Sequence, residues 1–218
     1  MTGVVPFASP ESAAASTPRV VEHLRAGGLI AYPTETVYGL GSLAKAAPVA
    51  ALAGLKGRAP GKPFLLLVSN RDMVEALGLA FNRSADALAR AFWPGPLTLV
   101  LPGGGGRLPD TLRGPEGGIA VRWTSHPLIA GLVATLGEPL TSTSANLPGQ
   151  SPEPGAAAIT RDFAGAVTSG QLLVLDGGVL GNRPPSTVVD CTTPSAALVR
   201  PGAISQAQMR AAVGALAP

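Results

Sequence analysis

Short apolar runs separated by turn-forming residues recur along the chain and predict the strands of a sheet. The runs at 29–32 and 64–68 are continuous, which is typical of strands buried on both faces. By the same pattern we expect further strands at 97–101, 119–122, 140–143, 172–175, 187–190 and 197–200, with a short edge strand at 3–7.

Helix signals lie between these strands. Ser16-Thr17-Pro18 has the composition of a helix start, and Gly27-Gly28 would end that helix. Other helices are predicted at 48–56, 72–77, 84–92, 127–136, 154–163 and 205–216. Because strands and helices alternate without a repeat or linker, the sequence predicts one α/β domain with a mixed sheet over residues 1–218. Its core would span about 16–205, followed by a terminal helix at about 205–216.

Composition narrows the class of protein. Hydrophobic residues make up 46% of the chain and charged residues 13%, which excludes disorder over most of its length. No apolar run approaches the roughly 20 residues that a membrane helix needs. No basic residue precedes Arg19, so a signal peptide is not expected, and the lone Cys191 has no intramolecular disulfide partner. We therefore expect a soluble, cytoplasmic protein without membrane contact.

A basic loop is the first candidate for chemistry. The net charge is +3, and three of the cations, Lys56, Arg58 and Lys62, fall within seven residues. Glycines in this loop allow close backbone approach and prolines stiffen it, which suits a polyanion such as a nucleoside triphosphate. The alternative is a solvated loop with Lys56 at a helix C-terminus, where cations are favoured.

Two polar segments follow predicted strands. Residues 32–41 hold both tyrosines of the chain around Thr34, Glu35 and Thr36, and ligands bind at such strand ends in open α/β sheets. Residues 141–146 carry four hydroxyls and an amide, which suit phosphate or ribose. An ordinary turn and a cap cluster are the respective alternatives.

Other segments argue against a P-loop, a metal site and a hydrolytic nucleophile. Gly103–Gly106 lacks the Gly-Lys-Ser/Thr ending of a phosphate-binding P-loop, so we interpret it as a hairpin tip. His126 has no spaced partners for a metal, and Cys191 is interpreted as a core residue. No Gly-x-Ser-x-Gly elbow or Ser-His-Asp order supports a hydrolytic nucleophile.

Seven segments resemble, in type and order, the motifs of the YrdC/TsaC family of threonylcarbamoyl-AMP synthases. They are Tyr32-Pro-Thr-Glu-Thr-Val-Tyr-Gly-Leu-Gly41, Lys56-Gly-Arg58 with Lys62-Pro63, Trp93-Pro-Gly-Pro-Leu-Thr98, Val121-Arg122 with His126-Pro127, Thr143-Ser-Ala-Asn146, Pro185-Ser-Thr-Val-Val-Asp190 and Arg200-Pro-Gly202. The resemblance covers about residues 30–205. It implies a twisted open mixed sheet with flanking helices and a large basic concave face, in the short single-domain form.

The resemblance also implies an activity. The family condenses L-threonine, bicarbonate or CO2, and ATP into threonylcarbamoyl-AMP and pyrophosphate. A transferase partner then moves the threonylcarbamoyl group to a tRNA adenosine next to the anticodon. Threonine carbamate is already an anion and can attack the α-phosphorus without a protein nucleophile. The site must supply alignment and charge stabilisation, with Mg²⁺ held mainly by the ATP phosphates and no metal held by the protein.

Site residues follow from the resemblance alone. The catalytic cluster would be Lys56, Arg58, Ser144 and Asn146. The ATP-binding set would be Arg58, Lys62, Gly118, Ser144, Ser151 and Arg200. The threonine-binding set would be Thr36, Arg122, Ser142 and Ser186, with Arg122 paired to the threonine carboxylate.

Two positions depart from the family pattern. Leu67 stands where many relatives have a histidine that helps to bind threonine, and Pro148 replaces a serine. Both bear on amino-acid binding more than on the nucleotide site. One alternative is a relative that binds double-stranded RNA or tRNA without synthase activity. Others are a carbamoyl-adenylate activity, as in hydrogenase-maturation proteins, and a purely structural α/β module.

Overall fold

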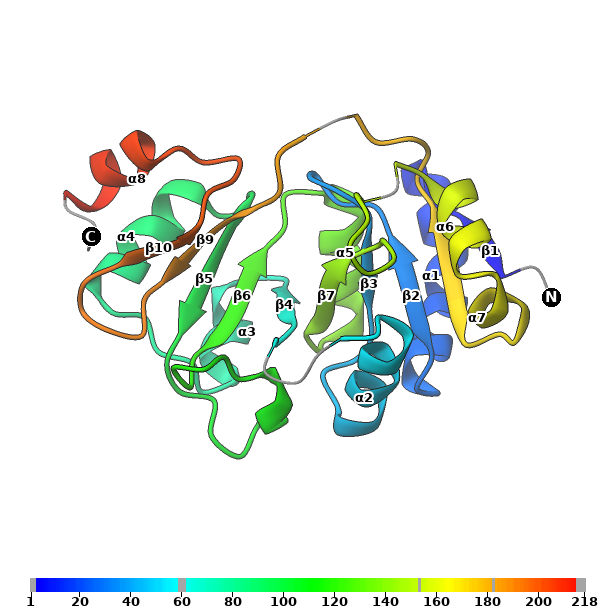
Figure 1. Ribbon diagram of the computed structural model, residues 1–218, viewed down its shortest axis with the longest axis horizontal. Helices are drawn as coiled ribbons and strands as arrows, with labels where there is room; N and C mark the ends of the chain where they lie inside the picture. The colour runs from blue at the N-terminus through cyan, green and yellow to red at the C-terminus, as the bar shows by residue number, and fades with distance from the viewer. Residues whose placement is uncertain (1–2, 59–61, 153, 182, 215–218) are drawn as a thin grey trace.

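The computed structural model describes residues 3–58, 62–152, 154–181 and 183–214, and its main feature is one mixed sheet (Figure 1). The ten strands are ordered β1-β8-β2-β3-β7-β4-β6-β5-β9-β10. Their bounds are β1 Val4–Pro6, β2 Leu29–Tyr32, β3 Gly39–Gly41, β4 Leu65–Val68, β5 Leu97–Leu101, β6 Ile119–Trp123, β7 Leu140–Ser144, β8 Leu172–Asp176, β9 Thr187–Asp190 and β10 Ala197–Arg200. Parallel and antiparallel pairs both occur, so the predicted mixed sheet is confirmed.

Helices flank this sheet, as predicted. Their bounds are α1 Pro10–Arg25, α2 Ala46–Leu55, α3 Arg71–Ala76, α4 Arg83–Phe92, α5 Pro127–Leu136, α6 Ala156–Asp162, α7 Ala164–Thr168 and α8 Gln206–Val213, with a 3-10 turn at Asp110–Leu112. The helix predicted at 127–136 is confirmed at both ends. The end of the predicted terminal helix, 215–216, lies outside the described residues.

The predicted start of the first helix at Ser16 is wrong. The helix begins six residues earlier, at Pro10, and Pro18 lies inside it. Ser9 caps the first turn, because its hydroxyl accepts from the Ser12 amide at 3.2 Å and the Ser12 hydroxyl accepts from the Ser9 amide at 3.0 Å. This reciprocal capping satisfies backbone N–H groups at the start of the helix, which have no partner within the helix itself. Ser16 lies further along the same continuous helix, so it is not a start.

Half of the sheet is covered on both faces. Leu29 and Ala31 of β2 pack in one apolar cluster with residues of α2, α6 and α7. Ile30 and Tyr32, which alternate with them, pack in a second cluster with α1 and α5. Figure 1 shows α1 and α5 behind the sheet and α2, α6 and α7 in front of it.

The other half is covered on one face only. The apolar side chains Leu97, Leu99 and Leu101 of β5 are buried in the same core as residues of α3 and α4. Thr98 and Val100 alternate with them and face a cavity. In Figure 1, α3 and α4 lie behind this half, and no helix crosses its front. The uncovered half is therefore available for a ligand.

Within the described residues, no helix is long and apolar enough to cross a membrane. The glycines at 103–106 form a turn that is tied to the α3–α4 connection, because the Gly104 amide donates to the Gly78 carbonyl at 2.9 Å. This turn does not line the cavity.

Candidate active site

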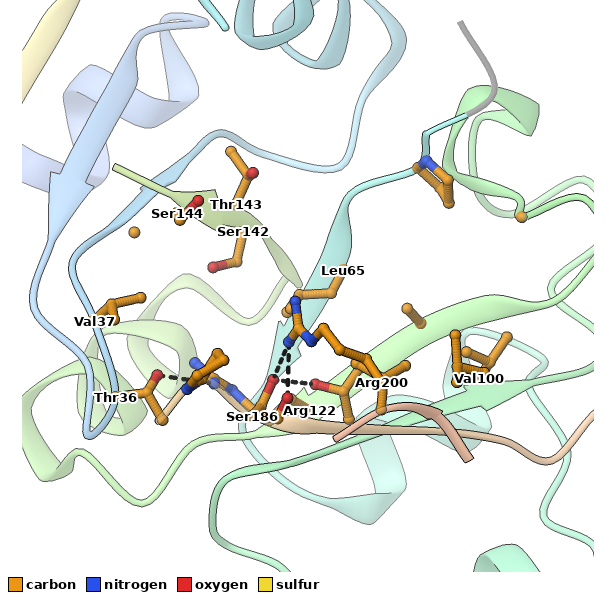
Figure 2. Close-up of a pocket in the computed structure, with 18 of the residues that line it drawn as sticks. Thr36, Val37, Leu65, Val100, Arg122, Ser142, Thr143, Ser144, Ser186 and Arg200 are labelled. Atoms are coloured by element: carbon orange, nitrogen blue, oxygen red, sulfur yellow. Dashed lines mark hydrogen bonds between the residues drawn. The ribbon is translucent and has the colours of Figure 1, made fainter. Parts of the chain in front are cut away.

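A cavity of about 590 Å³ opens on the uncovered half of the sheet. Strands β5, β6 and β9 contribute its floor, and the segment before β3, the end of β7 and β10 contribute its walls. Eight of the predicted site residues line it: Thr36, Arg58, Gly118, Arg122, Ser142, Ser144, Ser186 and Arg200. Figure 2 shows Arg122, Arg200 and Ser186 on one side, with Ser142, Thr143 and Ser144 across from them. Segments far apart in sequence thus meet around one space.

Arg58 is anchored where the basic loop reaches the cavity. Its Nε donates to the carbonyl of Lys62 at 2.6 Å, and one terminal nitrogen donates to the carbonyl of Pro63 at 2.6 Å. The other terminal nitrogen donates to Oγ1 of Thr143 at 2.9 Å, and the guanidinium lies 4.5 Å from the ring centre of Phe64. Burial lowers the pKa of Arg58. A guanidinium has five N–H donors, so this fixed orientation leaves capacity for an anion.

Lys56 and Asn146 lie behind the cavity wall. Nζ of Lys56 donates to Oδ1 of Asn146 at 3.1 Å and to the Asn146 carbonyl. The Ser144 hydroxyl donates to the same Oδ1. Burial, and next the neighbouring charge of Arg58, lowers the pKa of Lys56 to about 8. The predicted catalytic cluster is therefore assembled, although only Arg58 and Ser144 of its members line the cavity.

Arg122 projects from β6 beside the segment that follows β2. It donates to Oγ1 of Thr36 at 3.3 Å, and the Thr36 hydroxyl lies 3.0 Å from that of Thr34. Its Nε lies 3.9 Å from Oε1 of Glu35. The Arg122 side chain is only 4% exposed, so its charge is held in a low-dielectric setting with one carboxylate beside it. An anion in the cavity would therefore meet a strongly attractive, fixed guanidinium.

Arg200 and Ser186 form a linked pair at the edge of β10 and the start of β9. One terminal nitrogen of Arg200 donates to the Ser186 carbonyl at 2.8 Å and to the Ser186 hydroxyl at 3.2 Å (Figure 2). Burial lowers the pKa of Arg200, as does the positive charge of Arg122. The two arginines are thus close enough to raise the positive potential of the cavity together.

Some predicted residues lie elsewhere. Lys62 and Ser151 are exposed and do not line the cavity, and residues 59–61 of the basic loop lie outside the described part of the chain. Leu67 is fully buried among apolar residues that include Leu140, so the cavity wall of β4 is formed by Leu65 instead. Pro148 is exposed beside the basic loop, and a side chain on Gly57 would come within 3.6 Å of it.

Several lining residues were in none of the predicted catalytic or binding sets, although Thr143 lies in the polar segment 141–146. Thr98 and Thr143 add hydroxyls, and Val100, Val188 and Val199 make one side of the cavity aliphatic. The run Leu-Thr-Leu-Val-Leu of β5 is apolar enough to indicate burial on both faces, so it gave no signal that alternate residues face a ligand. Gly118 lines the cavity beside β5, where a Cβ would approach Val100 Cγ1 to 2.6 Å.

The cavity also contains carboxylates. Glu116 and Asp190 line it, and Asp190 Oδ1 accepts the Thr192 amide at 2.8 Å. Among the residues that the structure describes, no group of three or more His, Cys, Asp or Glu side chains could hold a metal ion. Mg²⁺ usually takes one or two carboxylates together with substrate phosphates and water, so these two carboxylates would fit an ion that arrives with a phosphate-bearing ligand.

Known proteins share both the sequence and this architecture. The sequence model of the Sua5/YciO/YrdC family, described as "Telomere recombination", matches residues 22–202. The "Threonylcarbamoyl-AMP synthase" of Thiobacillus denitrificans is 39% identical over 188 residues, which cover 86% of this chain and 97% of the relative. The protein of the same name from Bacillus subtilis is 34% identical over 192 residues, which cover 88% of this chain and 54% of that relative.

A solved structure agrees with these matches. The crystal structure of P. abyssi Sua5 complexed with L-threonine has a TM-score of 0.88 and 30% identity, and the match covers 97% of this chain and 61% of that one. The chain thus spans only part of its longer relatives and nearly all of the Thiobacillus protein. The matched residues 22–202 include the strands and loops that build the cavity, so the chain belongs to the Sua5/YciO/YrdC family.

Proposed function

We propose that this chain is a threonylcarbamoyl-AMP synthase, which converts L-threonine, bicarbonate or CO2, and ATP into threonylcarbamoyl-AMP and pyrophosphate. The observation that carries the proposal is the convergence of Arg58, Arg122 and Arg200 on one cavity, where hydroxyls and aliphatic groups outnumber the two carboxylates. Two separated anions, a polyphosphate and a carboxylate, account for three cations on one cavity, of which Arg122 is buried, better than one anion does. The names of the relatives support the same reaction.

ATP would occupy the part of the cavity that Arg58 and Arg200 both reach. Their guanidinium groups and the Ser144 hydroxyl would contact the phosphates, with Lys56 and Asn146 fixing Ser144 from behind. The aliphatic surface of Val100, Val188 and Val199 suits the face of a purine base, because an aromatic ring gains free energy when it leaves water. We assign Lys62, Gly118 and Ser151 to the margin of this nucleotide site.

L-Threonine would lie against Arg122, next to the nucleotide in the same cavity. Its carboxylate would pair with that guanidinium, and the hydroxyls of Thr36, Ser142 and Ser186 would contact its polar groups. The threonine-bound P. abyssi Sua5 structure supports an amino-acid site in this fold. This placement would bring the amine of threonine toward the phosphates of ATP within the same cavity.

Positioning and electrostatics would supply the catalysis. Threonine carbamate would attack the α-phosphorus of ATP, the new bond forming from carbamate oxygen to phosphorus as the bond to pyrophosphate breaks. Arg58 and Arg200 would stabilise the charge that shifts to the departing pyrophosphate. Mg²⁺ would enter as MgATP, bound mainly to the phosphates, and its charge would further neutralise them. No protein nucleophile is needed for this displacement.

The decisive assay is pyrophosphate release from MgATP, with and without L-threonine and bicarbonate, and with L-serine in place of threonine. We expect release only when amino acid and bicarbonate are both present, with threonine preferred. Mass spectrometry of the products should then show threonylcarbamoyl-AMP. Pyrophosphate release that does not depend on threonine, or ATP binding without pyrophosphate release, would overturn the proposal. The Arg90→Ala variant is a matched control, because Arg90 lies on an exposed face of α4 and, within the described residues, its ion pair is with Asp86.

Threonylcarbamoyl-AMP would then pass to a transferase partner that modifies a tRNA adenosine next to the anticodon. We propose that contact with tRNA occurs at this stage. We also propose that the protein acts in the cytoplasm, where such tRNA is processed. An RNA-binding relative without synthase activity is not favoured, because the similar proteins are named as synthases.

A further inference from the structure

The segment from Trp93 to Thr98 contributes Thr98 to the cavity, but no residue of the segment has been assigned a role in binding or catalysis. The Trp93 indole nitrogen donates to the Leu97 carbonyl at 2.7 Å, which ties the start of the segment to β5. The Pro96 carbonyl accepts the Thr187 amide at 3.0 Å, which ties β5 to the start of β9. These two bonds hold Thr98 beside Ser186, the residue that precedes β9.

Thr98 and Ser186 share one buried hydrogen bond. Their hydroxyl oxygens are 2.9 Å apart, and the two residues are 1% and 2% exposed. Both line the cavity. Within the described part of the chain, the Thr98 hydroxyl has no other hydrogen-bond partner, whereas the Ser186 hydroxyl also accepts from Arg200 at 3.2 Å.

The direction of this bond decides which hydroxyl proton is left for the cavity. A hydroxyl has one proton and two acceptor positions. If Ser186 donated to Thr98, the remaining proton would be that of Thr98, whose oxygen contacts no cation among the described residues. If Thr98 donates, the Ser186 oxygen accepts from both Thr98 and Arg200, and the remaining proton is that of Ser186. The second arrangement places the free donor beside the guanidinium that attracts an anionic ligand.

We infer that Thr98 is a positioning residue: it donates to Ser186 and thereby turns the Ser186 hydroxyl into a hydrogen-bond donor to the bound substrate. The group that accepts from Ser186 is an anionic oxygen, because Arg200 lies beside it and Arg122 adds positive potential nearby. This inference rests on the proposed function and assigns the accepting oxygen to the amino acid or its carbamate. The role of the Trp93–Thr98 segment is then to hold Thr98 beside Ser186.

Two substitutions separate positioning from structure. Thr98→Val keeps the shape of the side chain and removes its hydroxyl, and Thr98→Ser keeps the hydroxyl. We expect Thr98→Val to raise the KM for L-threonine roughly 3- to 10-fold, the effect of one hydrogen bond, with a smaller change in the KM for ATP. Thr98→Ser should return the KM for threonine to within about twofold of the wild-type value. If Thr98→Val does not fold, Thr98→Ala takes its place.

Thr141→Val is the matched structural control. Thr141 is also a buried strand threonine, but its hydroxyl bonds to Ser42 and it does not line the cavity. We expect this variant to lose thermal stability while keeping the KM for threonine. In a Ser186→Ala background, Thr98→Val should have no further effect on the KM.

Several outcomes would overturn the inference: an unchanged KM in Thr98→Val, no rescue by Thr98→Ser, or additive effects of the Thr98 and Ser186 substitutions. Calorimetric binding of L-threonine distinguishes this failure from that of the proposed function. If the wild type binds threonine but releases no pyrophosphate, the proposed function fails, and weaker binding by Thr98→Val still supports the role of Thr98. If the wild type binds no threonine, both fail.

Discussion

Glu35 and Arg122 form a buried ion pair at the side of the cavity, with 3.9 Å between Oε1 of Glu35 and Nε of Arg122. Their side chains are 11% and 4% exposed. Neither of these two atoms has a hydrogen-bond partner among the described residues, although the other carboxylate oxygen of Glu35 accepts from Thr124. Glu35 therefore offsets the charge of Arg122 without occupying the donors that face the cavity.

We expect Glu35→Gln to lower the free energy of unfolding by about 3 kcal/mol, because the buried Arg122 charge would lose its compensating carboxylate. Urea denaturation measures the change. Glu138→Gln is the matched control: its partner Lys45 is mostly exposed, and we expect a change of about 1 kcal/mol or less. Equal changes in the free energy of unfolding would show that the buried pair contributes no more to stability than the exposed pair.

Arg58→Ala should reduce pyrophosphate release by roughly 100-fold or more, because the variant loses a cation at the phosphates of ATP. It also loses the bonds to Thr143 and to the carbonyl of Pro63, so the loop should loosen while the rest of the fold remains. Steady-state kinetics and circular dichroism check the two parts. Near wild-type turnover would refute the assignment of Arg58.

The lowered pKa of Lys56 predicts an unusual pH dependence of stability. Its pKa in the folded protein is about 8, against 10.5 for an unperturbed lysine, because burial disfavours the charged form. Between these two values the unfolded chain binds more protons than the folded chain, so folding becomes more favourable as the pH rises. We expect the wild type to gain stability relative to Lys56→Met between about pH 8 and pH 10.5. A flat or falling difference in the free energy of unfolding would contradict the shift.

Leu67 tests whether the missing histidine affects substrate choice. Because Leu67 is fully buried and does not line the cavity, Leu67→Val should cost about 1 kcal/mol of stability and leave the preference for threonine over serine unchanged. Thermal denaturation and the ratio of the two kcat/KM values provide the measurements. A changed ratio would mean that position 67 acts on the substrate despite its burial.

Two glycines should respond in opposite ways to alanine. A Cβ on Gly41 in β3 would lie 2.2 Å from the Thr141 carbonyl oxygen, so Gly41→Ala should destabilise the protein by about 1–3 kcal/mol. A Cβ on Gly54 in α2 would meet nothing within 4 Å, so Gly54→Ala should stabilise it by up to about 1 kcal/mol. Denaturation midpoints of the two variants check this pair, and a shift in the same direction would contradict it.

Local sequence patterns predicted most of the strands and helices, since each depends on residues that are close in the chain. The strand at 97–101 and the helix at 127–136 match at both ends. The strand Gly39–Gly41 was missed because a Gly-Leu-Gly triplet carries no alternation of side chains. It exists because its neighbours β2 and β7 pair with it on both sides.

The resemblance of ordered motifs indicated the family and a set of polar residues, and eight of these line the cavity. It did not indicate Thr98 as a neighbour of Ser186, because 88 residues separate the two in sequence.

By itself, the sequence determined the alternation of strands and helices, the aliphatic core and the types of residue available for anion binding. The tertiary structure alone decided which half of the sheet stays uncovered and which side chains meet there. The reason is physical: periodicity shows that a strand has two faces, but only the strand order and the helices packed on it decide which face is left to solvent.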